Sequence, residues 1–126
     1  MGKTIRSDDA PGAIGPYSQA MLAGGVLYAS GQIGLDPGTG NLVPGGFEAE
    51  ARQVMANLAA VARAAGMTLA NAVKLTVYVV DLADFPKLNA IFESVLAEPY
   101  PARATVQVAA LPKGARVEVD MIAVGE

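Results

Sequence analysis

An arginine and two carboxylates near the C-terminal end of this 126-residue chain are the side chains best suited to chemistry. Arg103 stands two residues before Thr105, and Glu118 stands two residues before Asp120. Because a guanidinium binds carboxylates through two parallel hydrogen bonds, Arg103 could anchor a carboxylate ligand while Glu118 holds a water molecule. The residue types alone favour a plainer interpretation, an ion pair between strands that contributes about 0 to 1 kcal/mol.

The composition excludes several other classes of catalyst. The chain has no histidine and no cysteine, so it cannot build Ser-His-Asp or Cys-His nucleophile systems, histidine general bases or Cys/His zinc sites. On one strand, the Cα atoms of Glu118 and Asp120 would lie about 6.5 to 7 Å apart, a spacing that could suggest metal ligands or the carboxylate pair of a glycosidase. Neither is favoured, since no third metal ligand is evident and so small a chain leaves little room for a sugar cleft.

Charge and hydropathy point away from nucleic acids and membranes. Nine basic and twelve acidic residues give a net charge of -3, without the positive surface that binds phosphate backbones. Residues 10–35 carry no charge, but glycines, prolines and polar side chains interrupt them, so they do not predict a membrane span. The N-terminus has no secretory pattern. We expect a single cytoplasmic domain over residues 1–126.

The chain has more apolar residues than one small subunit can easily bury. Hydrophobic residues make up 52% of it and charged residues 17%, whereas about 25% charge is typical. A subunit interface is the simplest place for the surplus.

Three segments before residue 81 have the pattern of strands. Residues 17–22 and 26–32 are separated by a pair of glycines and predict a hairpin. Residues 73–80 alternate in polarity, which predicts a half-buried strand with Val73 and Leu75 on the same inner face.

Two more strands are predicted near the C-terminus, over residues 103–111 and 116–124. The connection between them is short and contains Pro112 and Gly114, so we expect them to pair as a hairpin. That pairing would place four polar side chains together on one polar face of the sheet: Arg103, Thr105, Glu118 and Asp120.

Two segments predict helices. Residues 48–65 repeat apolar side chains at three- and four-residue steps, and Gly66 follows as a C-terminal cap. We expect the outer face of this helix to be solvated; it carries Glu48, Glu50, Arg52, Gln53, Asn57 and Arg63. The second predicted helix runs from Asp84, its N-cap, to Leu96, with inward-facing Phe85, Leu88, Phe92 and Val95. The fold predicted is α+β, a mostly antiparallel sheet with both helices on one face.

Three other polar residues are weaker candidates for a site. Tyr17 and Ser30 flank the first hairpin and could offer hydroxyl groups to a ligand, although buried hydroxyls more often bind the backbone. Asn89 lies inside the second helix and is expected to be a capping or packing residue.

The order and spacing of several short segments resemble one known family. The segments are Ala10-Pro11, Ile14-Gly15-Pro16-Tyr17-Ser18-Gln19, Ser30-Gly31-Gln32-Ile33, Asn57-Leu58, residues 77–85, Tyr100-Pro101-Ala102-Arg103-Ala104-Thr105 and Val117-Glu118-Val119. Together they resemble the RidA family of reactive intermediate deaminases, formerly YjgF, also described as L-PSP endoribonucleases. The resemblance spans nearly the whole chain.

The resemblance implies a chorismate-mutase-like fold, a homotrimer and a ligand site between neighbouring subunits. It implies hydrolysis of enamine and imine acids, such as 2-aminoacrylate, 2-iminopropanoate and 2-iminobutanoate, to 2-oxo acids and ammonia. It implies no cofactor and no metal.

The resemblance also assigns roles to residues. Arg103 would bind the substrate carboxylate and Glu118 would orient or activate water. The backbones of Gly31 and Thr105 would shape the pocket with the side chains of Tyr17, Ser30 and Asn89. Many family members have a cysteine at the position of Thr105, so this chain would act without a thiol.

Two alternatives to a deaminase are considered. The first is a non-catalytic protein that binds small acids through Arg103. The second is an RNA-cleaving translation inhibitor, which the acidic charge, the absence of histidine and the few aromatic residues disfavour.

Overall fold

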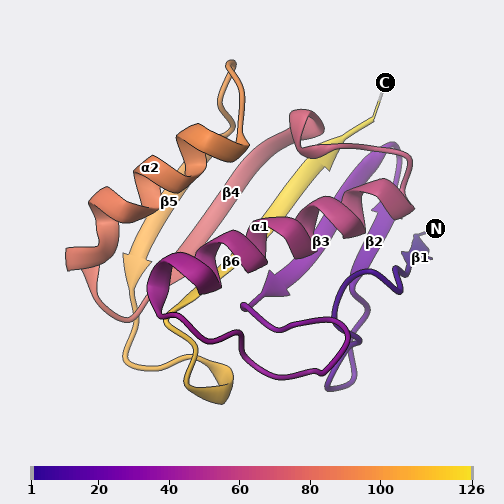
Figure 1. Cartoon of the computed structure of the whole chain (residues 1–126). Helices are drawn as coiled ribbons and strands as arrows, with labels where there is room; N and C mark the ends of the chain where they lie inside the picture. Colours follow the sequence, from indigo (N-terminus) through magenta and orange to yellow (C-terminus); the bar gives the residue numbers. More distant parts are fainter. Residues whose placement is uncertain (1, 126) are drawn as a thin grey trace.

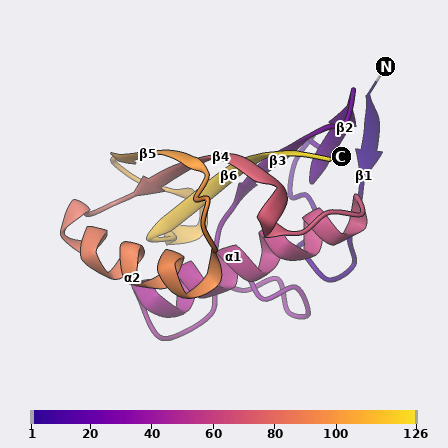
Figure 2. The same cartoon turned by 90° about the horizontal axis from the view of Figure 1, so that it is seen from above.

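A six-stranded mixed sheet with both helices on one face forms the framework of the molecule (Figures 1 and 2). The computed structural model describes residues 2–125. The strands are Lys3–Ile5 (β1), Ala20–Ala23 (β2), Val26–Gln32 (β3), Ala72–Val79 (β4), Ala102–Gln107 (β5) and Val117–Val124 (β6). They lie in the order β1-β2-β3-β6-β4-β5, and only the outer pair β4 and β5 is parallel. The predicted α+β fold is confirmed.

Helix α1, Phe47–Ala64, lies across the middle of the sheet (Figure 1). Its apolar stripe of Ala51, Val54, Leu58 and Val61 is almost completely buried, as the periodicity predicts. The helix ends where Gly66 adopts a φ of 74° and donates its N–H to the carbonyl of Arg63.

The solvated outer face predicted for this helix is wrong at two positions. Glu50 and Asn57 are both 0% exposed. Asn57 Nδ2 donates to the carbonyl oxygens of Ile33 at 3.3 Å and Leu35 at 3.0 Å, and the Glu50 carboxylate binds Arg116. The chain that leaves β3 folds back over this side of α1, so the helix is buried from two directions.

Helix α2, Phe85–Val95, packs over β4 and β5 beside α1 (Figure 1). Leu88 and Phe92 point into the core as predicted, while Phe85 stays 37% exposed. Asp84 precedes the helix, but its side chain makes no capping hydrogen bond. The Asp81 carboxylate instead accepts from the N–H of Ala83, in the 3-10 turn before the helix.

The predicted C-terminal hairpin is wrong, because β4 lies between β5 and β6. β6 pairs antiparallel with both β3 and β4, and β5 pairs parallel with β4. A parallel pair needs a crossover connection, which α2 provides. Alternation in a sequence indicates which face of a strand is buried but does not identify its neighbour in the sheet.

Among the earlier strands, β2, β3 and β4 lie near their predicted ranges, whereas the short strand β1 was not predicted. β2 and β3 form the expected antiparallel hairpin around Gly24 and Gly25, whose φ angles are both positive. In β4, Leu75 is buried but Val73 is 46% exposed. The pairing of β4 with β6 shifts register between Ala72 and Lys74, which turns Val73 away from the core.

Both helices described in residues 2–125 cover one face of the sheet, and neither covers the opposite face, here called the open face (Figure 2). Between a third and a half of each of four large apolar side chains on it is accessible: Met21, Tyr28, Val106 and Val124. Within residues 2–125 no helix is both long and apolar enough to cross a membrane.

Candidate active site

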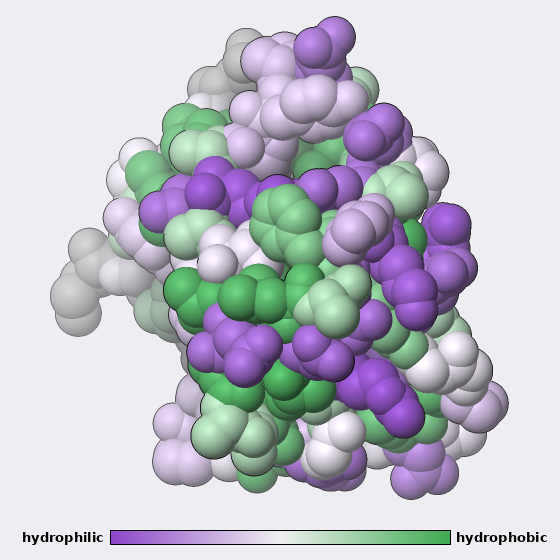
Figure 3. Space-filling view, turned by 90° about the vertical axis from the view of Figure 1, so that its left-hand side faces the viewer, coloured by the Kyte–Doolittle hydropathy of each residue, from purple (hydrophilic) through white to green (hydrophobic). Residues whose placement is uncertain are grey.

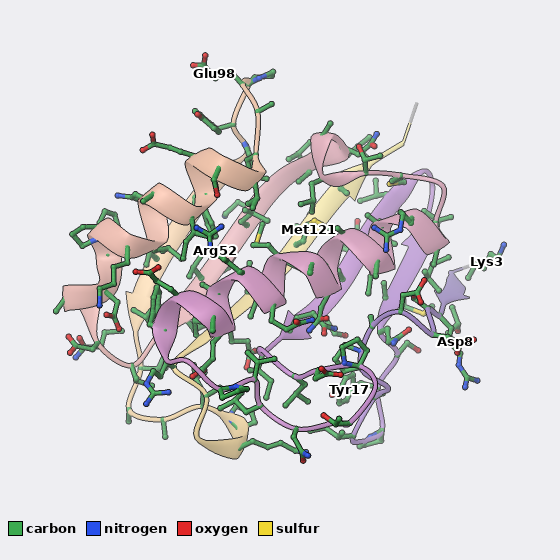
Figure 4. The ribbon with its side chains drawn as sticks, in the orientation of Figure 1. Lys3, Asp8, Tyr17, Arg52, Glu98 and Met121 are labelled. Carbon is green, nitrogen blue, oxygen red and sulfur yellow. The ribbon has the colours of Figure 1, made fainter. Side chains whose placement is uncertain are left out.

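The first candidate pocket is a cavity of about 340 Å³ at the end of β3, beside β6. Four residues predicted for the site line it: Tyr17, Ser30, Gly31 and Glu118. Tyr17 lies in the loop before β2 and not in the strand predicted there (Figure 4). Its hydroxyl accepts a hydrogen bond from the N–H of Ile14 at 3.3 Å.

A β-bulge brings Gly31 against Glu118. Ala29 pairs with Met121 and Gln32 pairs with Val119, so Ser30 and Gly31 together oppose a single residue of β6. A Cβ on Gly31 would collide with Glu118 Oε2 and would lie 2.9 Å from its carboxyl carbon. Only glycine leaves room for the carboxylate at this place.

The loop that closes this cavity is tied to the sheet by two side chains. Ser30 Oγ donates to the carbonyl of Ser18 at 2.6 Å. Gln19 is 5% exposed; its amide oxygen accepts from the N–H of Ser7 at 2.6 Å and its amide nitrogen donates to the carbonyl of Pro11 at 2.7 Å. Gln19 belongs to a segment that carried the family resemblance, but no sequence signal assigned it this role.

Burial raises the pKa of the Glu118 carboxyl above its usual value, and the nearby charge of Asp120 raises it further. Asp120 accepts a hydrogen bond from the Tyr78 hydroxyl at 2.9 Å. This hydrogen bond raises the pKa of Tyr78, with additional contributions from burial and from the charges of Asp120 and Glu118. A carboxyl beside a cavity whose pKa is raised holds a proton more readily than an ordinary carboxyl, which suits it to proton transfer.

The second candidate pocket, of about 280 Å³, lies between α2 and β5 and is lined by Asn89 and Arg103 among others. The Arg103 guanidinium carbon is 5.2 Å from the ring centre of Phe85 and 5.5 Å from that of Phe92. These rings hold the cation by cation–π attraction. The sequence predicts both phenylalanines only as core residues.

Apolar side chains gather on the surface around this pocket. Figure 3 faces the α2 and β5 side of the molecule, where hydrophobic residues form a patch bordered by hydrophilic ones. Leu82, Phe85 and Tyr100 are 45%, 37% and 51% exposed.

Arg103 and Glu118 do not share a pocket in one chain. Arg103 is in register with the buried Leu75, on the helix-bearing face of the sheet, whereas Glu118 is in register with Tyr78, on the open face. The prediction that both lie on one polar face is therefore wrong. The cross-strand ion pair is wrong too, because Arg103 makes no salt bridge with any carboxylate in residues 2–125.

Thr105 lies two residues from Arg103 on the same face of β5 and lines neither of these pockets. Its hydroxyl oxygen is buried and has no hydrogen-bond partner within residues 2–125. No group of three carboxylates in this part of the chain is arranged to hold a metal ion.

Comparison with known proteins identifies the family. The family model described as Endoribonuclease L-PSP matches residues 7–125. The chain belongs to this family, the RidA or YjgF family.

Solved structures and curated proteins agree with this assignment. RidA from Psychrobacter sp. PAMC 21119 superposes with a TM-score of 0.95 and 51% identity, covering 98% of this chain and 99% of that one. Escherichia coli TdcF with bound serine has a TM-score of 0.91 and 40% identity, covering 98% and 99%. Among curated relatives, the Bos taurus protein named 2-iminobutanoate/2-iminopropanoate deaminase is 49% identical over 97% of this chain and 89% of its own length.

Proposed function

We propose that this RidA-family chain is a 2-iminobutanoate/2-iminopropanoate deaminase, a hydrolase that converts imine and enamine acids of the 2-aminoacrylate type to 2-oxo acids and ammonia. The observation that carries the proposal is the 49% identity, over nearly the whole chain, to a relative that bears this name. Mammalian relatives at 48 to 50% identity share the name.

The proposed enzyme is a homotrimer in which the Arg103 pocket of one subunit meets the Glu118 pocket of its neighbour. Two observations support an intersubunit site. The two residues lie on opposite faces of one sheet, so a single chain cannot bring them to one ligand. The open face also carries exposed apolar side chains, such as Tyr28 and Val106, that an interface would bury.

In the proposed mechanism, the Arg103 guanidinium binds the substrate carboxylate and fixes the imine carbon near Glu118. Tyr17, Ser30 and Asn89 shape the pocket with the backbones of Gly31 and Thr105. The Glu118 carboxylate takes a proton from water as the water oxygen bonds to the carbon of the protonated imine, which gives a neutral carbinolamine. Glu118 then passes this proton to the nitrogen and takes up the proton of the carbinolamine hydroxyl as the carbon–nitrogen bond breaks. A 2-oxo acid and ammonia leave, and Glu118 releases its proton to solvent. No step needs a cofactor or a metal.

A coupled assay tests this function. A threonine or serine dehydratase generates the imine, and the release of 2-oxo acid is followed above the spontaneous rate. We expect wild-type protein to accelerate the release and Arg103→Ala to abolish the acceleration. Full acceleration by Arg103→Ala would contradict the proposed role of Arg103, and none by wild type would contradict the function.

A second candidate, a non-catalytic protein that binds small acids, draws on the TdcF structure, whose title names bound serine. Tight binding of a 2-oxo acid without release of ammonia from the imine would favour it.

A net charge of -3 supports the absence of a nucleic-acid partner. The cytoplasmic location that the sequence predicts is part of the proposal, and cell fractionation would test it.

A further inference from the structure

Glu50, in the first turn of α1, is a fully buried carboxylate that the mechanism above does not use. Its Oε1 accepts from the backbone N–H of Arg116 at 2.8 Å, and its Oε2 accepts from Arg116 Nη1 at 2.6 Å. A carboxylate loses much hydration when it is buried, and pairing only partly repays that loss. We propose that Glu50 is a positioning residue that holds Glu118 against Gly31.

Glu50, Arg116, Gly34 and Asn57 form an arrangement that we call the clamp. One side of this clamp reaches Glu118. Arg116 is the residue before β6, and Glu118 follows it by two positions. The N–H of Arg116 binds Glu50, while its carbonyl accepts from the N–H of Val80 at 3.3 Å. The N–H and the carbonyl of Arg116 are therefore both held at the point where β6 begins. This fixes the direction in which the Glu118 side chain projects from the strand.

The other side of the clamp reaches Gly31. Gly34, just after β3, lies so close to α1 that a Cβ there would be 2.8 Å from Glu50 Cα and 2.9 Å from its carbonyl oxygen. Two turns further along the helix, Asn57 binds the carbonyls of Ile33 and Leu35. The same side of α1 thus holds the end of β3 and the start of β6, the two strands across which Gly31 faces Glu118.

The Arg103 pocket is independent of this clamp. Arg103 lies on β5, at the far edge of the sheet, and is held there by Phe85 and Phe92. The inference rests on the proposed function, in which Arg103 binds substrate and Glu118 acts on water. Loosening the clamp should therefore lower kcat and leave KM almost unchanged.

The test compares Glu50→Gln with the matched control Glu48→Gln, an exposed acid in the same helical turn. Glutamine can still accept the N–H of Arg116 but loses the charge-assisted bond to its guanidinium. We expect kcat of Glu50→Gln to fall by about tenfold, typical for residues that orient a reacting group, with KM changed by less than about twofold. The assays are run below the unfolding transitions of both variants. An unchanged kcat, or a change confined to KM, would overturn the inference.

Hydrogen exchange gives a second readout that does not depend on turnover. In Glu50→Gln, the amides of residues 116–118 and 31–35 should exchange faster than in Glu48→Gln, while those of β5 should not. Equal exchange in the two variants would overturn the clamp. A wild-type protein that hydrolyses no imine would overturn the proposed function, whereas an active wild type with an unaffected Glu50→Gln would overturn the clamp alone.

Discussion

At the scale of single residues, the contact between Gly31 and Glu118 restricts both positions. The bulge in β3 leaves no space for a side chain at residue 31, because that space holds the carboxyl group. A change at Gly31 therefore acts on Glu118 without altering its chemistry.

Gly31→Ala should lower kcat by about 10- to 100-fold, because the added methyl group displaces the Glu118 carboxylate by an ångström or more. Gly12→Ala is the matched control, since Gly12 lines the same cavity but a Cβ there meets no atom within 4 Å. Imine hydrolysis by the two variants checks this. A wild-type rate for Gly31→Ala would mean that the carboxylate contact has no catalytic importance.

The raised pKa of Glu118 predicts the direction of the pH dependence. As a base, Glu118 acts only when ionised, so kcat should fall as pH drops through its pKa, which lies above the ordinary carboxyl value. Asp120→Asn removes the neighbouring negative charge and leaves the larger effect of burial. The acid limb of the profile should therefore move to lower pH without reaching the position of an exposed glutamate. A shift to higher pH would contradict the assigned cause.

At the scale of elements, what the sequence could predict depended on how locally each feature is determined. The helices, the β2–β3 hairpin and the buried faces of β4 and β6 follow from periodicity and turn residues within a few positions. The partner of β5 does not, because a long-range arrangement through α2 decides it. Glu50 and Asn57 were equally out of reach, since a polar residue in a helical stripe looks the same whether water or a folded-back loop covers it.

Among the site residues, the sequence resemblance named positions but could not assign them to pockets. Tyr17, Ser30, Gly31 and Glu118 line one cavity, and Asn89 and Arg103 line another. The division follows from the register of β5 and β6 on β4: Arg103 is paired with Leu75 and Glu118 with Tyr78, and these two residues of β4 point to opposite faces. No pattern in either strand carries that information.

The packing of α2 on β5 predicts how Arg103 is kept in place. Phe85→Ala removes one of two aromatic rings beside the guanidinium, worth about 0.5 to 1 kcal/mol at an exposed site. We therefore expect KM to rise by about two- to fivefold with little change in kcat. Leu82→Ala is the control, because Leu82 is exposed nearby, in the turn before the helix, and is not stacked on Arg103. An unchanged KM for Phe85→Ala would show that Phe92 alone suffices.

At the scale of the whole molecule, the separation of Arg103 from Glu118 predicts complementation between inactive variants. Arg103→Ala and Glu118→Gln should each be inactive alone. When the two are unfolded together and refolded as an equal mixture, about a quarter of the intersubunit sites in a trimer should contain one intact residue from each neighbour. Activity near a quarter of the wild-type value is expected. No recovery, with mixed trimers verified by mass spectrometry, would place both residues of each site in one chain.

The central position of β6 has a consequence for how the protein is made. Within residues 2–125, β6 is the last strand in the sequence, yet it lies between β3 and β4 in the sheet. During synthesis, β3 and β4 each keep one edge unpaired until residues 117–124 have left the ribosome, because no earlier segment of residues 2–125 pairs with those edges. The nascent chain therefore keeps these two strand edges unpaired until β6 has emerged, and Glu118 arrives with the strand that completes the core.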